Sequence, residues 1–227
     1  MALWSVAGAQ NSEGPSLPDR KKSGRQAWIV ATSLPDDVKS PVTVLAGGEL
    51  SEVRLSKRSV GTSIKVPKDG VIQVVKPSLS EDGKTTYEIL VSVMIPEGIK
   101  KSLIILAPVP NLKPPLKFRA RIVDLDKFRG GNALIVNNTN LEIGVVLGAK
   151  KATLGTGQIQ IMDVGEFSGS KNVTVSYHFR LPKQEKWNLI SASTVPLRSS
   201  FREILIFSYN ADLGQADYHG ITFPVED

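Results

Sequence analysis

The sequence has no cysteine and only two histidines among its 227 residues. The absence of cysteine excludes disulfide bridges, thiolate nucleophiles and thiolate zinc sites. Long apolar runs, convincing amphipathic helices and the glycine motifs that bind nucleotide phosphates are missing as well. So are the nucleophile motif G-x-S-x-G and a calcium loop of the D-x-D-x-D-G type. We therefore expect a non-catalytic protein with no metal, no cofactor and no membrane span.

Charge of one sign is not concentrated in any segment. The chain has 28 basic and 22 acidic residues, a net charge of +6, and its basic residues occur as scattered pairs such as Lys100 and Lys101. Aromatic residues account for 6% of the chain. A nucleic-acid site usually combines clustered Lys and Arg with stacking aromatics. We expect no nucleic-acid partner, and weak nucleic-acid binding remains an alternative.

The N-terminal segment is typical of an export signal that has lost its beginning. In MALWSVAGAQ, Ala7 and Ala9 take the −3 and −1 positions that signal peptidase accepts. A polar N-terminus with chance small residues is the alternative. We expect residues 1–24 to be a disordered lead-in with a signal-peptide remnant up to Ala9. The protein is then exported, to the periplasm or the cell surface.

Turn residues between Val- and Ile-rich runs are abundant. The chain contains 14 prolines and 19 glycines. Turn signals such as PKDG (67–70), and the hairpin pattern LGAKKATL (147–154), separate runs in which apolar and polar residues alternate. The pattern predicts an all-β protein made of antiparallel β-sandwiches of the Ig or transthyretin-like kind.

The chain also repeats itself. AWIVATS (27–33) resembles ALIVNNT (133–139), and further pairs of segments follow in the same order. These pairs match 53–55 with 145–147, 71–75 with 158–162, 87–96 with 173–182, and 118–123 with 201–206. The repeats predict two tandem, duplicated domains. The first covers residues 25–126, the joint 127–132 and the second domain 133–227.

Three residues are candidate contacts for a ligand or partner. Segment 173–182 alternates, which places His178 and Arg180 on a polar outer face. The same alternation in segment 87–96 predicts that Tyr87 faces the core. Trp187 follows a charged loop and is the best-placed aromatic residue for a carbohydrate or protein contact. Trp28 matches Leu134 of the other copy, so we expect it in the core.

Two acidic residues near the joint raise the possibility of acid–base chemistry. Asp124 and Asp126 in VDLDKF share a strand face, but Lys127 follows them, which favours a local salt bridge. His219 in ADYHG is expected in a C-terminal loop and has no identifiable metal-ligating partners.

Residues 134–162 contain phrases of the form V-N-x-T, V-x-L-G and L-x-x-G-Q. This stretch resembles uncharacterised exported bacterial β-sandwich accessory proteins of the alginate-biosynthesis type. The resemblance implies binding in the cell envelope or to polysaccharide, and it carries over no catalytic residue.

These observations predict a non-catalytic binding or structural module of the bacterial cell envelope. We expect it to contact a protein partner or a glycan, and sheet edges make a homo-oligomer a further possibility. The alternative is an enzymatic function, namely a hydrolase that acts on a polysaccharide. It requires Asp124 and a second carboxyl group roughly 5–10 Å apart in a cleft.

Overall fold

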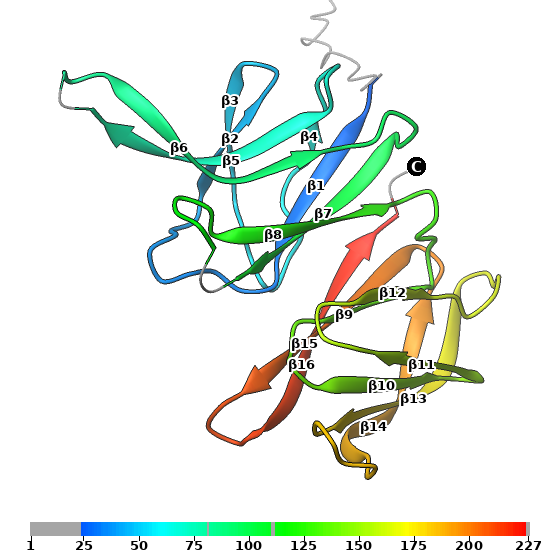
Figure 1. Ribbon diagram of the computed structural model, residues 1–227. Coiled ribbons are helices and arrows are strands. Elements are labelled where there is room, and N and C mark those ends of the chain that lie inside the picture. Colours follow the sequence, from blue (N-terminus) through cyan, green and yellow to red (C-terminus); the bar gives the residue numbers. More distant parts are fainter. Residues whose placement is uncertain (1–23, 81, 110–111, 226–227) are drawn as a thin grey trace, which may run out of the picture.

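The computed structural model describes residues 24–80, 82–109 and 112–225, and this part of the chain consists of strands, turns and irregular segments (Figure 1). The predicted all-β class is therefore confirmed. The expected lead-in and signal-peptide remnant, at residues 1–23, lie outside the described residues. The described residues include no helix long and apolar enough to cross a membrane.

The first half of the chain forms one sandwich of two sheets. Its inner sheet has the strand order β4-β1-β7-β8 and its outer sheet has the order β3-β2-β5-β6. The strands are β1 (Gln26–Ala31), β2 (Val42–Ala46), β3 (Glu49–Val53), β4 (Ile64–Lys65), β5 (Val71–Leu79), β6 (Thr85–Met94), β7 (Lys101–Pro108) and β8 (Phe118–Asp124).

The second half repeats this arrangement, strand for strand. Its inner sheet has the order β12-β9-β15-β16 and its outer sheet the order β11-β10-β13-β14, so each strand has a counterpart eight strands earlier. The strands are β9 (Ala133–Asn137), β10 (Glu142–Leu147), β11 (Lys150–Leu154), β12 (Ile159–Met162), β13 (Ser170–Arg180), β14 (Asn188–Arg198), β15 (Phe201–Asn210) and β16 (Gln215–Pro224). The predicted pair of duplicated sandwiches is confirmed.

Most of the segment matches behind that prediction are nevertheless wrong. AWIVATS and ALIVNNT begin the equivalent strands β1 and β9. The other pairs match β3 with β10, β5 with β12, β6 with β13 and β8 with β15, which are not counterparts. Alternating strands resemble one another at many offsets because their side-chain period is two residues. The prediction that Tyr87 faces the core is also wrong, because this residue is 40% exposed. The β5–β6 pairing shifts register between Val74 and Val75, so the alternation of segment 87–96 does not continue from Val91 back to Tyr87.

Each inner sheet contains one parallel pair among its antiparallel ones. In each inner sheet the first strand pairs in parallel with the seventh, β1 with β7 and β9 with β15. Parallel pairs need a long crossover connection. Here the connection contains the whole outer sheet of the same half and the edge strand of the inner sheet, and the first and seventh strands are the two central strands of the inner sheet.

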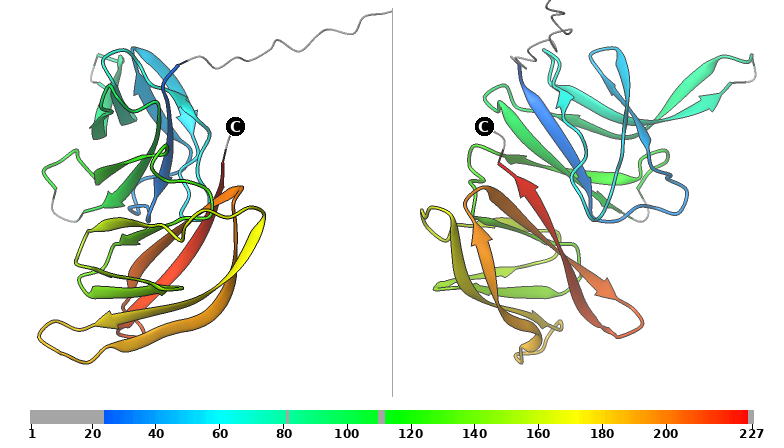
Figure 2. Two further views of the ribbon diagram at one scale, coloured as in Figure 1. Left: turned by 90° about the vertical axis from the view of Figure 1, so that its right-hand side faces the viewer. Right: turned by 180° about the vertical axis from the view of Figure 1, so that it is seen from behind.

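Both faces of the central strands of the inner sheets are largely buried. Ala27 and Ile29 of β1 contribute to the core of the first sandwich, whereas the alternate residues Trp28 and Val30 point toward the second half. A third hydrophobic core lies between the two inner sheets, and we call it the shared core. Figure 2 shows the two halves stacked one on the other. Its members are Trp28, Val30, Leu103, Ile105, Val123, Leu125, Phe128, Leu134, Val136, Ile204, Ile206, Ile221 and Phe223.

The joint between the halves is packed against this core. Phe128 of the joint is fully buried within it. The buried Arg202 of β15 donates hydrogen bonds to the carbonyl groups of Phe128 and Leu125, which ties the joint to the second half. A Cβ atom on Gly130 would lie 1.8 Å from the carbonyl oxygen of Ser199, so this close approach requires glycine. The joint is therefore a packed part of the interface.

Truncating a side chain of the shared core should destabilise the whole protein. We expect Leu103→Ala to lower the free energy of unfolding by about 2–5 kcal/mol in denaturant titrations, because it leaves a cavity between the inner sheets. Ser92→Ala on an exposed strand face is the matched control, expected within about 0.5 kcal/mol of the parent. Both variants should unfold in one transition. Two separate transitions, with only one of them shifted by Leu103→Ala, would contradict a core shared by the halves.

His219 lies within β16, opposite Ile206, and not in a loop as expected. Its Nε2 atom is buried without a hydrogen-bond partner among the described residues. Burial is the largest effect and lowers the pKa of His219 below its usual 6.5. The backbone of Lys57, the next largest effect, raises this pKa, as Asp217 does more weakly, whereas the positive charges of Lys57 and Arg58 lower it. The folded protein thus favours the neutral imidazole.

This preference makes stability depend on pH. Because the pKa of His219 is lower in the folded than in the unfolded chain, its favourable contribution is complete above pH 6.5 and is lost as the pH falls toward the folded-state value. We expect His219→Gln to reduce the fall in unfolding free energy between neutral and mildly acidic pH. Parallel denaturant titrations of both proteins measure this difference. Identical pH profiles would contradict it.

Candidate functional site

The three candidate contact residues come together on the outer sheet of the second half. His178 and Arg180 lie near the end of β13, and Trp187 lies in the connection between β13 and β14. All three contact the outward side of this sheet around Gly144 of β10. We call this region the Trp187 surface.

Arg180 is held in place by a partner on the neighbouring strand. Arg180 and Glu142 are opposite each other in the β10–β13 register, and the Nε of Arg180 donates to the Glu142 carboxylate at 2.6 Å. The guanidinium carbon lies 4.8 Å from the centre of the Trp187 ring, within the range of a cation–π contact. The ion pair therefore fixes a cation beside the indole.

Gly144 explains how the indole can lie so close to the sheet. A Cβ atom at this position would lie 3.0 Å from Cζ3 and 3.3 Å from Cη2 of Trp187. Gly144 does not have a positive φ, so its role is to allow the close approach and not to permit an unusual backbone conformation. The six-membered part of the indole thus lies directly against the backbone of β10.

His178 is placed beside the ring by its strand. It lies directly across from Gly144, and its Nε2 is 3.1 Å from the hydroxyl of Ser176. The pairing of β13 with β14 is irregular between Tyr177 and His178, which locally alters the twist of the sheet. The imidazole, held through one nitrogen, therefore borders the surface in a defined orientation.

A shallow pocket of about 330 Å³ opens on the Trp187 surface. Trp187, Gly144 and Val146 provide apolar contacts, whereas His178, Lys151 and Thr153 provide polar groups. An aromatic wall with hydrogen-bonding groups around it is suited to a small ring that has an apolar face and polar edges.

The remaining residues considered from the sequence have other surroundings. Trp28 is 3% exposed in the shared core, as expected. Asp124 accepts a hydrogen bond from the backbone of Asp126 and lies 3.9 Å from the ammonium group of Lys127, consistent with the local salt bridge. Within the described ranges, no group of three or more His, Asp or Glu side chains could hold a metal ion.

Two residues that the sequence reasoning did not single out border a larger pocket. Arg119 and Arg121 of β8 line a space between the inner sheets of the two halves. Neither residue belongs to the Trp187 surface, and their arrangement is a separate feature of the molecule.

Comparison with known proteins adds no further assignment, because no protein-family model and no curated protein matches this chain. The site must therefore be interpreted from its own geometry.

A side chain at position 144 should displace the indole. We expect Gly144→Val to shift the Trp187 emission to longer wavelength and to lower the free energy of unfolding by about 1–3 kcal/mol, because the added atoms occupy the space of the ring. The Trp187 emission is obtained by subtracting the spectrum of the same protein with Trp187→Phe. Ser92→Val, on an exposed strand face of the other half, should leave the emission unchanged. An unshifted spectrum for Gly144→Val would contradict the packing.

Proposed function

We propose that this protein is a non-catalytic glycan-binding module that contacts a sugar ring at the Trp187 surface. The observation that carries the proposal is the pocket in which a fixed indole forms one wall and His178, Thr153 and Lys151 supply hydrogen-bonding groups. The proposal fits an exported protein, as the N-terminal sequence predicts.

The chemistry of a sugar ring matches this arrangement. A pyranose has C–H groups on its faces, which pack on an aromatic ring, and hydroxyl groups around its edge, which need donors and acceptors. The pocket volume of about 330 Å³ is enough for one such ring. Because Arg180 and Glu142 hold each other and the indole, little side-chain entropy is lost on binding.

The same contacts favour binding over catalysis. Glu142 is the carboxylate of this constellation, and it is paired with Arg180. A glycosidase uses two carboxyl groups flanking the scissile bond. The Trp187 surface provides an aromatic wall, an imidazole, a hydroxyl and an ammonium group instead.

Removing the indole should weaken sugar binding. We expect a glycan array to identify a ligand for the native protein, and Trp187→Ala to weaken its binding by about tenfold or more in calorimetric titrations, because the aromatic wall is lost. Tyr209→Ala removes an exposed aromatic side chain elsewhere in the second half and should leave affinity unchanged. The proposal fails if no glycan binds, or if both substitutions weaken binding equally.

A further inference from the structure

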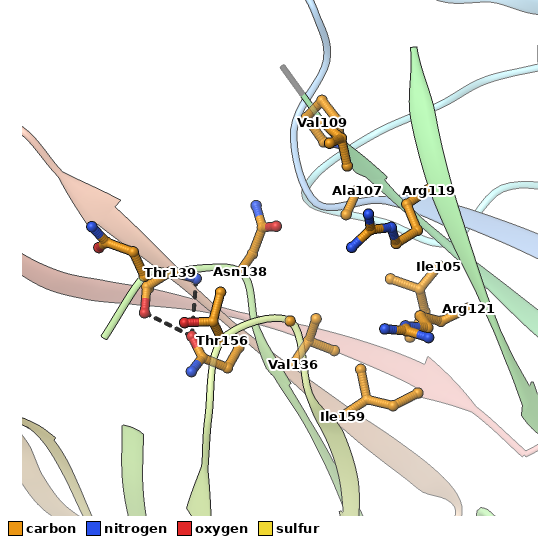
Figure 3. A pocket seen from close by; sticks show the side chains of 14 residues that line it. Ile105, Ala107, Val109, Arg119, Arg121, Val136, Asn138, Thr139, Thr156 and Ile159 are labelled. Atoms are coloured by element: carbon orange, nitrogen blue, oxygen red, sulfur yellow. Dashed lines mark hydrogen bonds between the residues drawn. The ribbon is translucent and has the colours of Figure 1, made fainter. Parts of the chain in front are cut away.

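A pocket of about 450 Å³ lies between the two halves, at one end of the shared core (Figure 3). On one side it is bordered by β7 and β8 of the first half. On the other side it is bordered by the end of β9, the loop after it, and the turn before β12 of the second half. Ile105 and Val136 of the shared core, together with Ile159, form its apolar floor. Both halves are needed to form this pocket.

Two arginines project into this space from one strand. Arg119 and Arg121 are two positions apart on β8, so they share a face and their Cα atoms are roughly 7 Å apart. The same face continues to Val123, which is buried in the shared core. The strand thus changes from apolar to cationic where it leaves the core, and Figure 3 shows both guanidinium groups directed into the pocket.

These two cations have no counter-ion within the described structure. Neither the side chain of Arg119 nor that of Arg121 makes an ion pair or a hydrogen bond with another described residue. Among the described residues, those that line the pocket include no Asp and no Glu. Two like charges on neighbouring positions repel each other, and an anion between them would remove that repulsion.

The opposite wall is neutral, polar and well ordered by hydrogen bonds. Asn137 is buried, and its Nδ2 donates to the carbonyl groups of Leu141 at 2.8 Å and Leu154 at 3.0 Å. Its Oδ1 accepts from the backbone and the hydroxyl of Thr139, at 2.9 and 2.7 Å. This network fixes the loop that carries Asn138, whose side chain faces the same space as the arginines in Figure 3.

The duplicated half shows that the fold does not require arginine at these positions. Val123 faces Leu103 and its counterpart Ile221 faces Ile204, so Arg121 corresponds to His219 and Arg119 to Asp217. The same backbone positions thus accept an imidazole and a carboxylate. The arginine pair is a property of this pocket and not of the fold.

We infer that this pocket binds an organic carboxylate. Guanidinium groups are planar donors whose geometry matches a carboxylate, and the pair can bind it from two sides. The apolar floor of Ile105, Val136 and Ile159 accommodates the body that carries the acid group. A free organic acid and the acidic sugar of a glycan share this chemistry, and the pocket volume admits either at the size of one ring.

Calorimetric titration with benzoate and with glucuronate distinguishes these two sources. We expect at least one of the two acids to bind, and the uncharged analogues benzamide and glucose to bind more weakly. Inorganic sulfate tests whether charge alone is enough, and we expect it to bind more weakly than the preferred acid because it gains nothing from the apolar floor. The inference is overturned if neither acid binds at millimolar concentration, or if sulfate binds as tightly as both.

A double substitution tests the arginines directly. Arg119→Gln with Arg121→Gln should weaken binding of the preferred acid by about tenfold or more, because both charge-assisted contacts are lost. Arg54→Gln with Lys150→Gln removes the same charge from exposed positions outside the pocket and should change affinity by less than about twofold. Equal losses in the two double variants would show diffuse electrostatic attraction and would overturn the site. Trp187→Ala should leave acid binding intact, so this result is separable from the proposed sugar contact.

A charge placed on the opposite wall gives a second readout. Asn138→Asp should put a carboxylate in front of the arginines, raise the melting temperature of the ligand-free protein and weaken binding of the acid. Unchanged stability and unchanged affinity would mean that position 138 does not face the guanidinium groups, which would overturn the site.

Discussion

Burial of the inner sheets on both faces is the constraint on which the rest of this structure depends. A sandwich sheet ordinarily buries one face and exposes the other, which gives alternating apolar and polar residues. In β1 and β9 every second residue serves the core of its own half and the intervening residues serve the shared core. The result is a continuous apolar run such as AWIVA, and parallel pairing with β7 or β15, an arrangement typical of sheets that are covered on both sides.

Much of this architecture could be predicted from the sequence, for reasons that also explain the errors. Turn residues between alternating runs indicate strands, and AWIVATS and ALIVNNT identify the start of each copy because each is a continuous apolar run followed by polar residues. The strands of the outer sheets alternate with the same period, so they match any other alternating strand equally well, and the sequence order of matches does not correct a shift by one strand. The parallel pairs could not be predicted, because β1 and β7 are far apart in the chain and adjacent strands usually pair as hairpins.

The two candidate sites differ in how they depend on long-range structure. His178 and Arg180 are alternate residues of one strand and Trp187 is a few positions further along, so local periodicity was enough to group them. Their support by Glu142 and Gly144 of β10 required the strand pairing. Arg119 and Arg121 had a local signal as well, since they continue the face of Val123. Its meaning depended on the shared core, because only the packing of one half on the other turns that face into the wall of a pocket.

The two ends of the shared core show how a duplicated fold can acquire different chemistry. Where both copies are buried, counterparts keep their apolar character, as Val123 and Ile221 do. Two residues earlier on the same strands, the counterparts differ: the first half has Arg121 and the second half has His219. The surroundings of these two residues differ as well. Lys57 and Arg58 influence the imidazole of His219, whereas the described residues on the wall opposite Arg121 include no Asp or Glu. Packing therefore requires apolar residues inside the shared core, whereas the residues at its two ends can differ between the copies. Arg119 and Arg121 lie beside a neutral, hydrogen-bonded loop, and their two unbalanced charges do not stabilise the fold. An anionic ligand gives those charges a physical role.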